Sequence, residues 1–333
     1  MHITPRLIRT WADEGNIPDL TLAELDYRLT QVLMGVYSDP FLRDRLYLKG
    51  GTALNKLFFP STNRLSVDLD FNAVGPKVQV VQERPQMARR VMDILAGQDV
   101  EYRPEHDYRY EQSTIEASFA PLSGAGRQHL KLEISYIERV AILGREDRPL
   151  PIPSQAEAPL IATYRLEELA STKLRALFSR RKGRDIYDLY QIGALPFDEQ
   201  ALRKLTLYYF YHARMIFSYP SFLANLHEKI KLHAFADDVR GLIRVGQGFD
   251  WDRACRMVID RFAFLDNLDE RDRVFLDLAR LMLGKPVSES GQGLARHIEH
   301  PLAWLMEGVT ISAEAASLRQ DDIRLFTPAE EQR

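Results

Sequence analysis

Residues 48–71 read LKGGTALNKLFFPSTNRLSVDLDF, and the fold prediction starts from this stretch. Its last five residues alternate between apolar and acidic side chains. Successive side chains of a β-strand point to opposite faces, so Asp68 and Asp70 would share one face while their apolar neighbours enter the core. Two carboxylates held together repel each other, and Mg²⁺ is typically bound by one or two carboxylates plus substrate phosphates. We therefore expect a metal site on this strand, used for chemistry on a nucleoside triphosphate.

A glycine turn comes before the acids. Gly50 and Gly51 precede a predicted helix, where exposed backbone N–H groups can bind phosphate and the Thr52 hydroxyl adds a donor. Taken singly, this turn is also typical of plain helix capping, and the acid pair is also typical of a surface strand. Together, and with Arg64 and Ser66 just before the acids, they favour a nucleotide site.

A second alternating segment supplies a candidate third carboxylate. The segment LKLEISY, residues 130–136, places its apolar residues on one face and Lys131, Glu133 and Ser135 on the other. We expect Glu133 to join the two aspartates at the metal. The alternative is a solvated strand face, because exposed glutamates are common.

The composition is that of an ordinary globular protein, large enough for two domains. The chain has 333 residues, of which 45% are hydrophobic and 27% are charged. Its net charge of −3 restricts any nucleic-acid contact to a local basic patch. The single cysteine, Cys255, excludes an intrachain disulfide, and we expect it to be buried. Because no segment resembles a signal peptide or a membrane span, we expect a cytoplasmic protein without a membrane partner.

The order of the predicted elements indicates an α+β fold. Thr4 and Pro5 mark the start of an N-terminal helix, and Thr21–Glu24 forms a capping box for a second helix. A proline-rich segment at residues 145–159 is expected to be a linker, and the chain from about residue 165 onward is expected to be helical. Between these parts the patterns predict a helix end or short strand at 46–48, helices at 52–59 and 83–96, and strands at 67–73, 99–103, 113–120 and 128–137.

A lysine on an apolar stripe marks a second group of candidate residues. Lys173 lies on or beside the apolar stripe of a predicted helix that spans residues 166–177, so it needs an anionic partner. It is either a snorkelling lysine or a lysine that reaches the triphosphate.

A basic run follows this helix. Asp185 and Asp188 are three residues apart on the next predicted helix and share a face. Asp185 is either a site residue or a structural partner for a nearby cation. The four basic residues could bind RNA phosphates or form a solvated helix end, and they are Arg180, Arg181, Lys182 and Arg184.

These segments together resemble the AbiEii/AbiGii nucleotidyltransferase toxins, which include the MenT-type toxins of type IV-style toxin–antitoxin and abortive-infection systems. The resemblance covers about residues 20–270, through LKGGTALNKLFF, RLSVDLDF, LKLEISY, LEELASTKLRAL and KGRDIYDLY. It implies a DNA-polymerase-β-like core with a small mixed sheet and a large helical C-terminal part. We expect N-terminal helices at 1–45, the nucleotidyltransferase α/β core at 46–150, and a helical domain at 151–333 that contributes Lys173 and Asp185 to the site.

The resemblance also implies an activity and its machinery. Family members transfer a nucleotide from an NTP to an acceptor, which in MenT-type members is the 3′ end of tRNA, and so block translation. A cognate antitoxin protein would be a partner, and two Mg²⁺ ions, or Mn²⁺, would be the cofactors. The implied metal ligands are Asp68 and Asp70, with Glu133 as a weaker candidate. The implied catalytic residues are these two aspartates together with Lys173 and Asp185, and Asp188 could share the role of Asp185. The implied nucleotide-binding residues are Gly50, Gly51, Thr52, Arg64 and Ser66.

Two alternatives remain open from the sequence. One is a nucleotidyltransferase that modifies a small molecule or a protein, which an acidic acceptor pocket would favour. The other is a degenerate, non-catalytic module that only binds nucleotide, which the intact acid pair argues against. The sequence names neither the NTP nor the acceptor.

Overall fold

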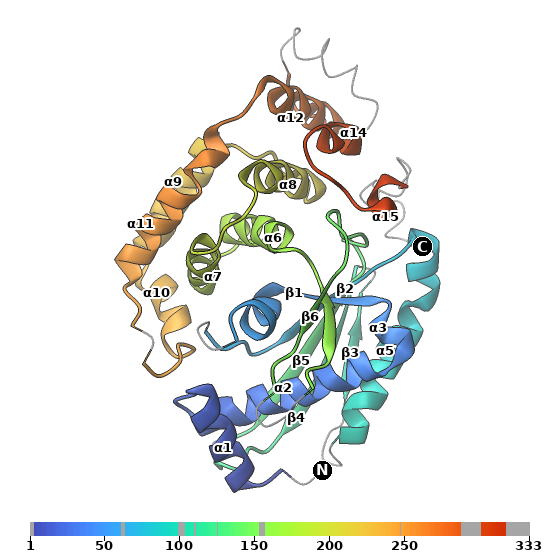
Figure 1. Ribbon diagram of the computed structural model, residues 1–333, viewed down its shortest axis with the longest axis vertical. Coiled ribbons are helices and arrows are strands. Elements are labelled where there is room, and N and C mark those ends of the chain that lie inside the picture. Colours follow the sequence, from blue (N-terminus) through green and yellow to red (C-terminus); the bar gives the residue numbers. More distant parts are fainter. Residues whose placement is uncertain are drawn as a thin grey trace.

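The structure is a computed structural model that describes residues 3–60, 64–98, 104–109, 111–124, 126–152, 157–246, 248–287 and 301–317. Across these residues, seven strands form one mixed sheet in the order β3-β4-β5-β2-β1-β7-β6. Helices cover both of its faces (Figure 1). The strands are β1 (Leu46–Lys49), β2 (Leu69–Ala73), β3 (Glu105–Tyr108), β4 (Gln112–Phe119), β5 (Gln128–Ser135), β6 (Glu146–Pro149) and β7 (Leu160–Thr163).

Strand β2 lies at the centre of the sheet and gives it one apolar and one polar face. It pairs antiparallel with β1 and parallel with β5. The register aligns Leu48, Phe71 and Ile134 in one row, and all three are fully buried. The neighbouring row aligns Lys49, Asp70 and Glu133 on the opposite face. The predicted alternation of both strands is therefore confirmed.

The N-terminal helices lie on the apolar side of the sheet, where α2 and α5 contact it, and the C-terminal helices lie on the polar side (Figure 1). The first group comprises α1 (Pro5–Gly15), α2 (Leu20–Ser38), α3 (Pro40–Arg43) and α5 (Lys77–Gln98). The short α4 (Gly50–Ala53) continues into a π-helical turn at Leu54–Phe58. The second group comprises α6 (Leu166–Ser179), α7 (Arg184–Gly193), α8 (Glu199–His212), α9 (Tyr219–Ile230), α10 (His233–Arg240), α11 (Trp251–Arg261), α12 (Glu270–Met282), α14 (Pro301–Met306) and α15 (Ala313–Ala316).

Most of the predicted elements are present, with shifted ends. Thr4 caps α1, as predicted. The capping box at Thr21–Glu24 is wrong: Asp19 caps α2 by accepting from Leu22 N, and the Thr21 hydroxyl instead lies 2.8 Å from that of Ser123. The strand predicted at 67–73 begins at Leu69, so Asp68 occupies the bend just before it. Helix α5 begins six residues earlier than predicted, and the strand predicted at 99–103 lies outside the described residues.

Three of the strands were not predicted, namely β3, β6 and β7. Strand β1 resolves the ambiguity at residues 46–48. Strand β6 falls inside the predicted linker, and β7 follows it directly. Because β7 pairs with β1 in the interior of the sheet, the sheet extends beyond residue 150. After residue 165 the described elements are all helical, as predicted.

Candidate active site

The sequence motifs come together at one cavity on the polar face of the sheet. The glycine turn directly follows β1, the acids lie at the start of β2, and α6 packs against the turn. The cavity has a volume of 210 Å³. Ten of the residues that line it were predicted from the sequence: Gly50, Gly51, Arg64, Ser66, Asp68, Asp70, Glu133, Lys173, Arg180 and Arg184. Five that line it were not predicted: Lys49, Glu138, Thr172, Arg175 and Ala176.

Asp70 carries the strongest electrostatic signature of the acid pair. Burial, followed by repulsion from the neighbouring Asp68 carboxylate, raises the pKa of Asp70 to about 6. Lys49 and Lys173 act in the opposite direction on this pKa. A partly buried carboxylate beside a like charge is stabilised in its ionised form by a cation, which is the behaviour expected of a metal ligand.

Both glycines lie where an added side chain would collide with a neighbouring side chain. Gly50 has a φ of +72°, and a Cβ on it would lie 2.8 Å from Asp70 Oδ2. A Cβ on Gly51 would lie 2.5 Å from Arg64 Nη2. The turn is therefore packed between an acid of the candidate metal site and a buried cation, and a side chain at either glycine would displace one of these two groups.

Thr52 lies behind the cavity instead of lining it. The side chain is fully buried, and its hydroxyl donates to the backbone carbonyl oxygen of Asp68 at 2.5 Å. The hydroxyl oxygens of Thr52 and Ser66 are 2.6 Å apart, and Ser66 Oγ is 3.3 Å from Asp68 Oδ1. These contacts fix the bend that carries Asp68 against the glycine turn.

A continuous network of ion pairs, buried except at Arg180, forms the wall of the cavity on the side of α6 and α7. Arg64 Nη2 lies 2.9 Å from Asp188 Oδ2, and Lys173 Nζ lies 2.6 Å from the same oxygen. Lys173 Nζ also lies 3.2 Å from Asp185 Oδ1. Arg180 completes the network with two bonds of 2.8 Å to the Asp185 carboxylate. Lys173 is therefore not a snorkelling lysine.

The network keeps its aspartates ionised and leaves the wall positively charged. Both aspartates are fully buried. Burial alone would raise the pKa of Asp185, but Lys173 and Arg180 lower it to about 2. Three cations face two carboxylates, so one positive charge remains uncompensated within the network. A polyanion in the cavity would compensate it.

Glu133 lies on the predicted face but is paired elsewhere. Its carboxylate is 2.6 Å from Lys131 Nζ, two residues away on β5. Within the described ranges, no group of three or more His, Cys, Asp or Glu side chains is close enough to hold a metal ion. Asp68 and Asp70 plus phosphate oxygens of a bound nucleotide are therefore the donor set that these residues offer Mg²⁺.

The basic run divides between the cavity and the surface. Arg180 and Arg184 line the cavity, whereas Arg181 and Lys182 lie outside it. Arg180 is nevertheless exposed on its other side, as are Arg181 and Lys182. Lys182 Nζ and Arg184 Nε each lie 3.6 Å from an oxygen of Asp238 on α10.

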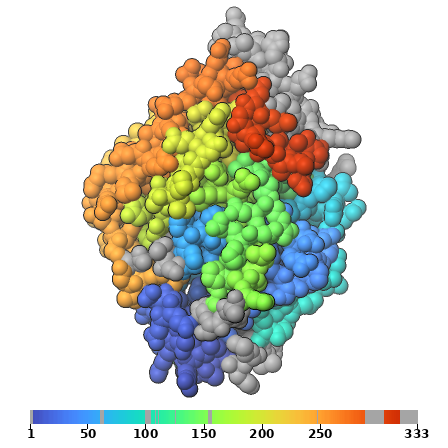
Figure 2. Space-filling model, in the orientation of Figure 1, coloured from blue at the N-terminus to red at the C-terminus, as the bar shows by residue number. Residues whose placement is uncertain are grey.

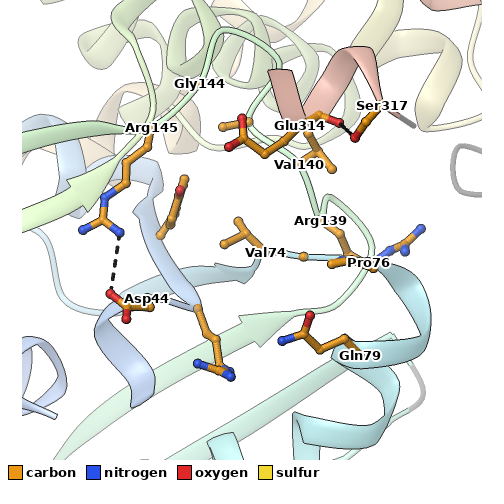
Figure 3. A pocket seen from close by; sticks show the side chains of 14 residues that line it. Asp44, Val74, Pro76, Gln79, Arg139, Val140, Gly144, Arg145, Glu314 and Ser317 are labelled. Carbon is orange, nitrogen blue, oxygen red and sulfur yellow. Dashed lines mark hydrogen bonds and ion pairs between the residues drawn. The ribbon is translucent and has the colours of Figure 1, made fainter. Parts of the chain in front are cut away.

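A separate cavity of 470 Å³ lies at the other end of β1 (Figure 3). Arg145 reaches toward Asp44 across its mouth, and Glu314 on α15 points into it (Figure 3). Its lining contains none of the predicted site residues. Arg145 there is paired with the carboxylate of Asp147, so this cavity offers less uncompensated positive charge than the first.

The comparisons with known proteins identify the family. The sequence profile described as "Nucleotidyl transferase AbiEii toxin, Type IV TA system" matches residues 31–256, more than half of the chain. The chain belongs to the AbiEii family. It is a nucleotidyltransferase toxin of a type IV toxin–antitoxin system, which implies a nucleotide substrate and an antitoxin partner.

Two solved structures are similar to this chain, and the first of them supports the fold. MenT4, a nucleotidyltransferase toxin from Mycobacterium tuberculosis H37Rv, superposes with a TM-score of 0.63 at 20% identity, covering 92% of this chain and 99% of that one. JHP933 from Helicobacter pylori gives a TM-score of 0.45 at 20% identity, covering 74% of this chain and 92% of that one. No curated protein sequence gives a significant match.

Two further sequence features were compared with the structure: the apolar character of the helices and the single cysteine. In the described ranges, none of the helices of this AbiEii protein combines the length and the apolar character of a membrane span. Cys255 is buried, as predicted, and burial raises the pKa of its thiol to about 12.

Proposed function

We propose that this AbiEii toxin transfers a nucleotide from an NTP to the 3′ end of an RNA, with tRNA as the acceptor, and thereby blocks translation. One observation carries the proposal: a glycine turn, an acid pair and a buried cation network line the same cavity. The RNA and its 3′ end come from the resemblance to MenT-type toxins. The proposed catalytic residues are Asp68, Asp70, Lys173 and Asp185.

The charge of the cavity supports a polyanionic acceptor over a cationic drug. Six of its lining residues are basic and four are acidic. Two of the acids, Asp68 and Asp70, would be neutralised by the metal, which leaves an excess of positive charge. Phosphate groups on both substrates would compensate it.

In the proposed reaction, a 3′-hydroxyl oxygen attacks the α-phosphorus of the NTP and loses its proton to water, the bond to the bridging oxygen breaks, and pyrophosphate leaves. The turn at Gly50 and Gly51 holds the phosphates close to the chain, because no side chain intervenes. Lys173 Nζ donates to Asp185 and forms an ion pair with Asp188, and its place in the cavity lining lets it also contact a phosphate oxygen. Asp185 keeps Lys173 and Arg180 oriented toward the developing charge on the leaving group.

The carboxylate oxygens of Asp68 and Asp70 fit Mg²⁺ or Mn²⁺, which prefer oxygen ligands. Held by these two carboxylates, such ions would supply stabilisation of the charge that develops on the reacting oxygens. Ser66 and Thr52 support the bend that carries Asp68.

Total RNA incubated with each labelled NTP and Mg²⁺, followed by sequencing of labelled 3′ ends, tests the proposal. We expect label on tRNA, and we expect Asp70→Ala to lower the transfer rate by about 100-fold or more, because the metal loses a ligand. A circular dichroism melt controls for folding of the variant. Full activity in folded Asp70→Ala would reject the metal assignment, and label confined to a protein or small-molecule fraction would reject RNA as acceptor.

A further inference from the structure

The cavity contains two separate groups of cations, one on each flank of α6. Lys173 and Arg180, which directly follows the last residue of α6, both bind the Asp185 carboxylate and therefore lie on the same flank. Arg175 lies about 200° further around the helix than Lys173, on the other flank. Thr172 and Ala176 line the cavity between the two flanks.

The first group borders the glycine turn. It consists of Arg64, Lys173 and Arg180, tied together by the two buried aspartates of α7. Arg64 lies against the glycine turn itself, because its guanidinium fills the space that a side chain on Gly51 would need. This group therefore belongs to the phosphate site for the NTP under the proposed function.

The second group is organised by a different carboxylate. Glu138 Oε1 lies 2.5 Å from Arg175 Nη1, and Glu138 Oε2 lies 3.9 Å from Lys49 Nζ. The amide nitrogen of Asn72 lies 3.4 Å from Glu138 Oε2 and donates to the Tyr164 hydroxyl oxygen at 2.9 Å. Despite its burial, Glu138 stays ionised, because Arg175 and Lys49 hold its pKa far below its usual value.

Lys49 forms a weaker ion pair within the protein than Lys173 does. Its ammonium is at the limit of ion-pair distance from Glu138, whereas Lys173 has a partner at 2.6 Å. Lys49 faces Asp70 directly across the β1–β2 pair, and its side chain is 25% exposed, in the cavity. Its charge is therefore available to a ligand beside the acid pair. Two cations share one carboxylate here, so this group also carries excess positive charge.

We propose that Lys49 and Arg175 bind a phosphate group of the acceptor strand, next to the attacking hydroxyl, and that Glu138 is the positioning residue for both. This inference rests on the proposed function. Nucleotidyl transfer to RNA brings two polyanions into one cavity, and each needs its own cations. The first group and the glycine turn serve the NTP, while the second group lies on the other flank of α6. Asp70 is within electrostatic range of both Lys49 and Lys173, as a residue at the reacting phosphate should be.

Steady-state kinetics with the two substrates varied separately tests this assignment. In Lys49→Gln and Arg175→Gln we expect the KM for tRNA to rise about tenfold or more, while the KM for the NTP stays within about twofold. The salt dependence of RNA binding, measured by fluorescence anisotropy, should fall by about one unit of log–log slope in each variant. Lys231→Gln, which removes one exposed positive charge outside the cavity, should change neither parameter.

Further variants separate a binding role from a structural one. Lys49→Arg should restore at least half of the acceptor affinity, because it keeps the charge. Glu138→Gln should raise the acceptor KM without changing NTP affinity, which a purely structural defect would not do. An unchanged acceptor KM in folded Lys49→Gln and Arg175→Gln, or an equal rise in the NTP KM, would overturn the inference. Wild-type protein that transfers nothing to any RNA would instead overturn the proposed function.

Discussion

At the scale of single residues, the acid pair shows how a functional group is held at the expense of stability. Asp70 lies beside Asp68 and Glu133 in a row that is partly removed from water. Its carboxylate has a pKa of about 6 in the folded protein against 3.8 in the unfolded chain. Because the pKa of this acid is raised on folding, its ionisation favours the unfolded state. The protonated carboxyl therefore contributes stability that is fully present below pH 4 and is lost as the pH rises through 6.

We expect Asp70→Asn to stabilise the metal-free protein at pH 8 by on the order of 1–2 kcal/mol, because the amide has no charge to be buried or to repel Asp68. At pH 4.5 the gain should shrink to less than half, since Asp70 is then largely protonated in the folded wild type. Urea unfolding in EDTA at the two pH values measures both differences. A gain independent of pH would show that the effect is not electrostatic.

Sequence patterns indicated the proposed catalytic residues better than the residues that position them. The acids and glycines were visible because strand alternation and turn composition are local signals. Lys49 and Glu138 were missed, although Lys49 directly precedes the glycine turn. Their importance follows from the pairing of β1 with β2 and from the position of Arg175, and no local pattern encodes such contacts.

At the scale of elements, ion pairs connect α7 to the segment before β2 and to α6. Asp188 on α7 accepts from Arg64, which lies 124 positions earlier in the chain, and Asp185 on the same helix binds α6 through Lys173. The spacing of the two aspartates predicted their shared helix face correctly. The sequence could not say which cations they meet, because those cations come from two other elements.

We expect Asp188→Ala to destabilise the protein by about 3–5 kcal/mol, because it leaves Arg64 and Lys173 buried with fewer anionic partners. Asp237→Ala is a matched control, since it removes an exposed i,i+3 ion pair on α10 and should cost less than about 1 kcal/mol. Denaturant midpoints of the three proteins give the comparison. Equal midpoints for the two variants would show that the network contributes nothing to stability.

At the scale of the whole molecule, the strand pair β6–β7 joins the two halves of the chain. In the space-filling view, the green segment that carries it lies between the blue-to-cyan N-terminal residues and the yellow-to-red helices (Figure 2). The sequence indicated a linker there because prolines are frequent, and a short strand beside prolines gives only a weak pattern. Strand β7 leads directly into α6, which supplies Lys173 and Arg175.

We expect a fragment of residues 1–150 not to fold on its own. Removing β7 would expose the hydrogen-bonding edge of β1 in the interior of the sheet, and an open edge of this kind promotes aggregation. Size-exclusion chromatography and thermal melting of this fragment, beside the full chain, test the expectation. A monomeric fragment with a cooperative transition would show that the core is independent of β7.

The alternation of β2 has a consequence for how this toxin can change over generations. Inserting or deleting one codon within the strand would exchange the faces of all residues beyond that point. Asp70 would then enter the core, and Phe71 would take its place in the cavity. Chemistry and folding would be lost in a single event, so this strand can diversify by replacing residues but not by changing its length.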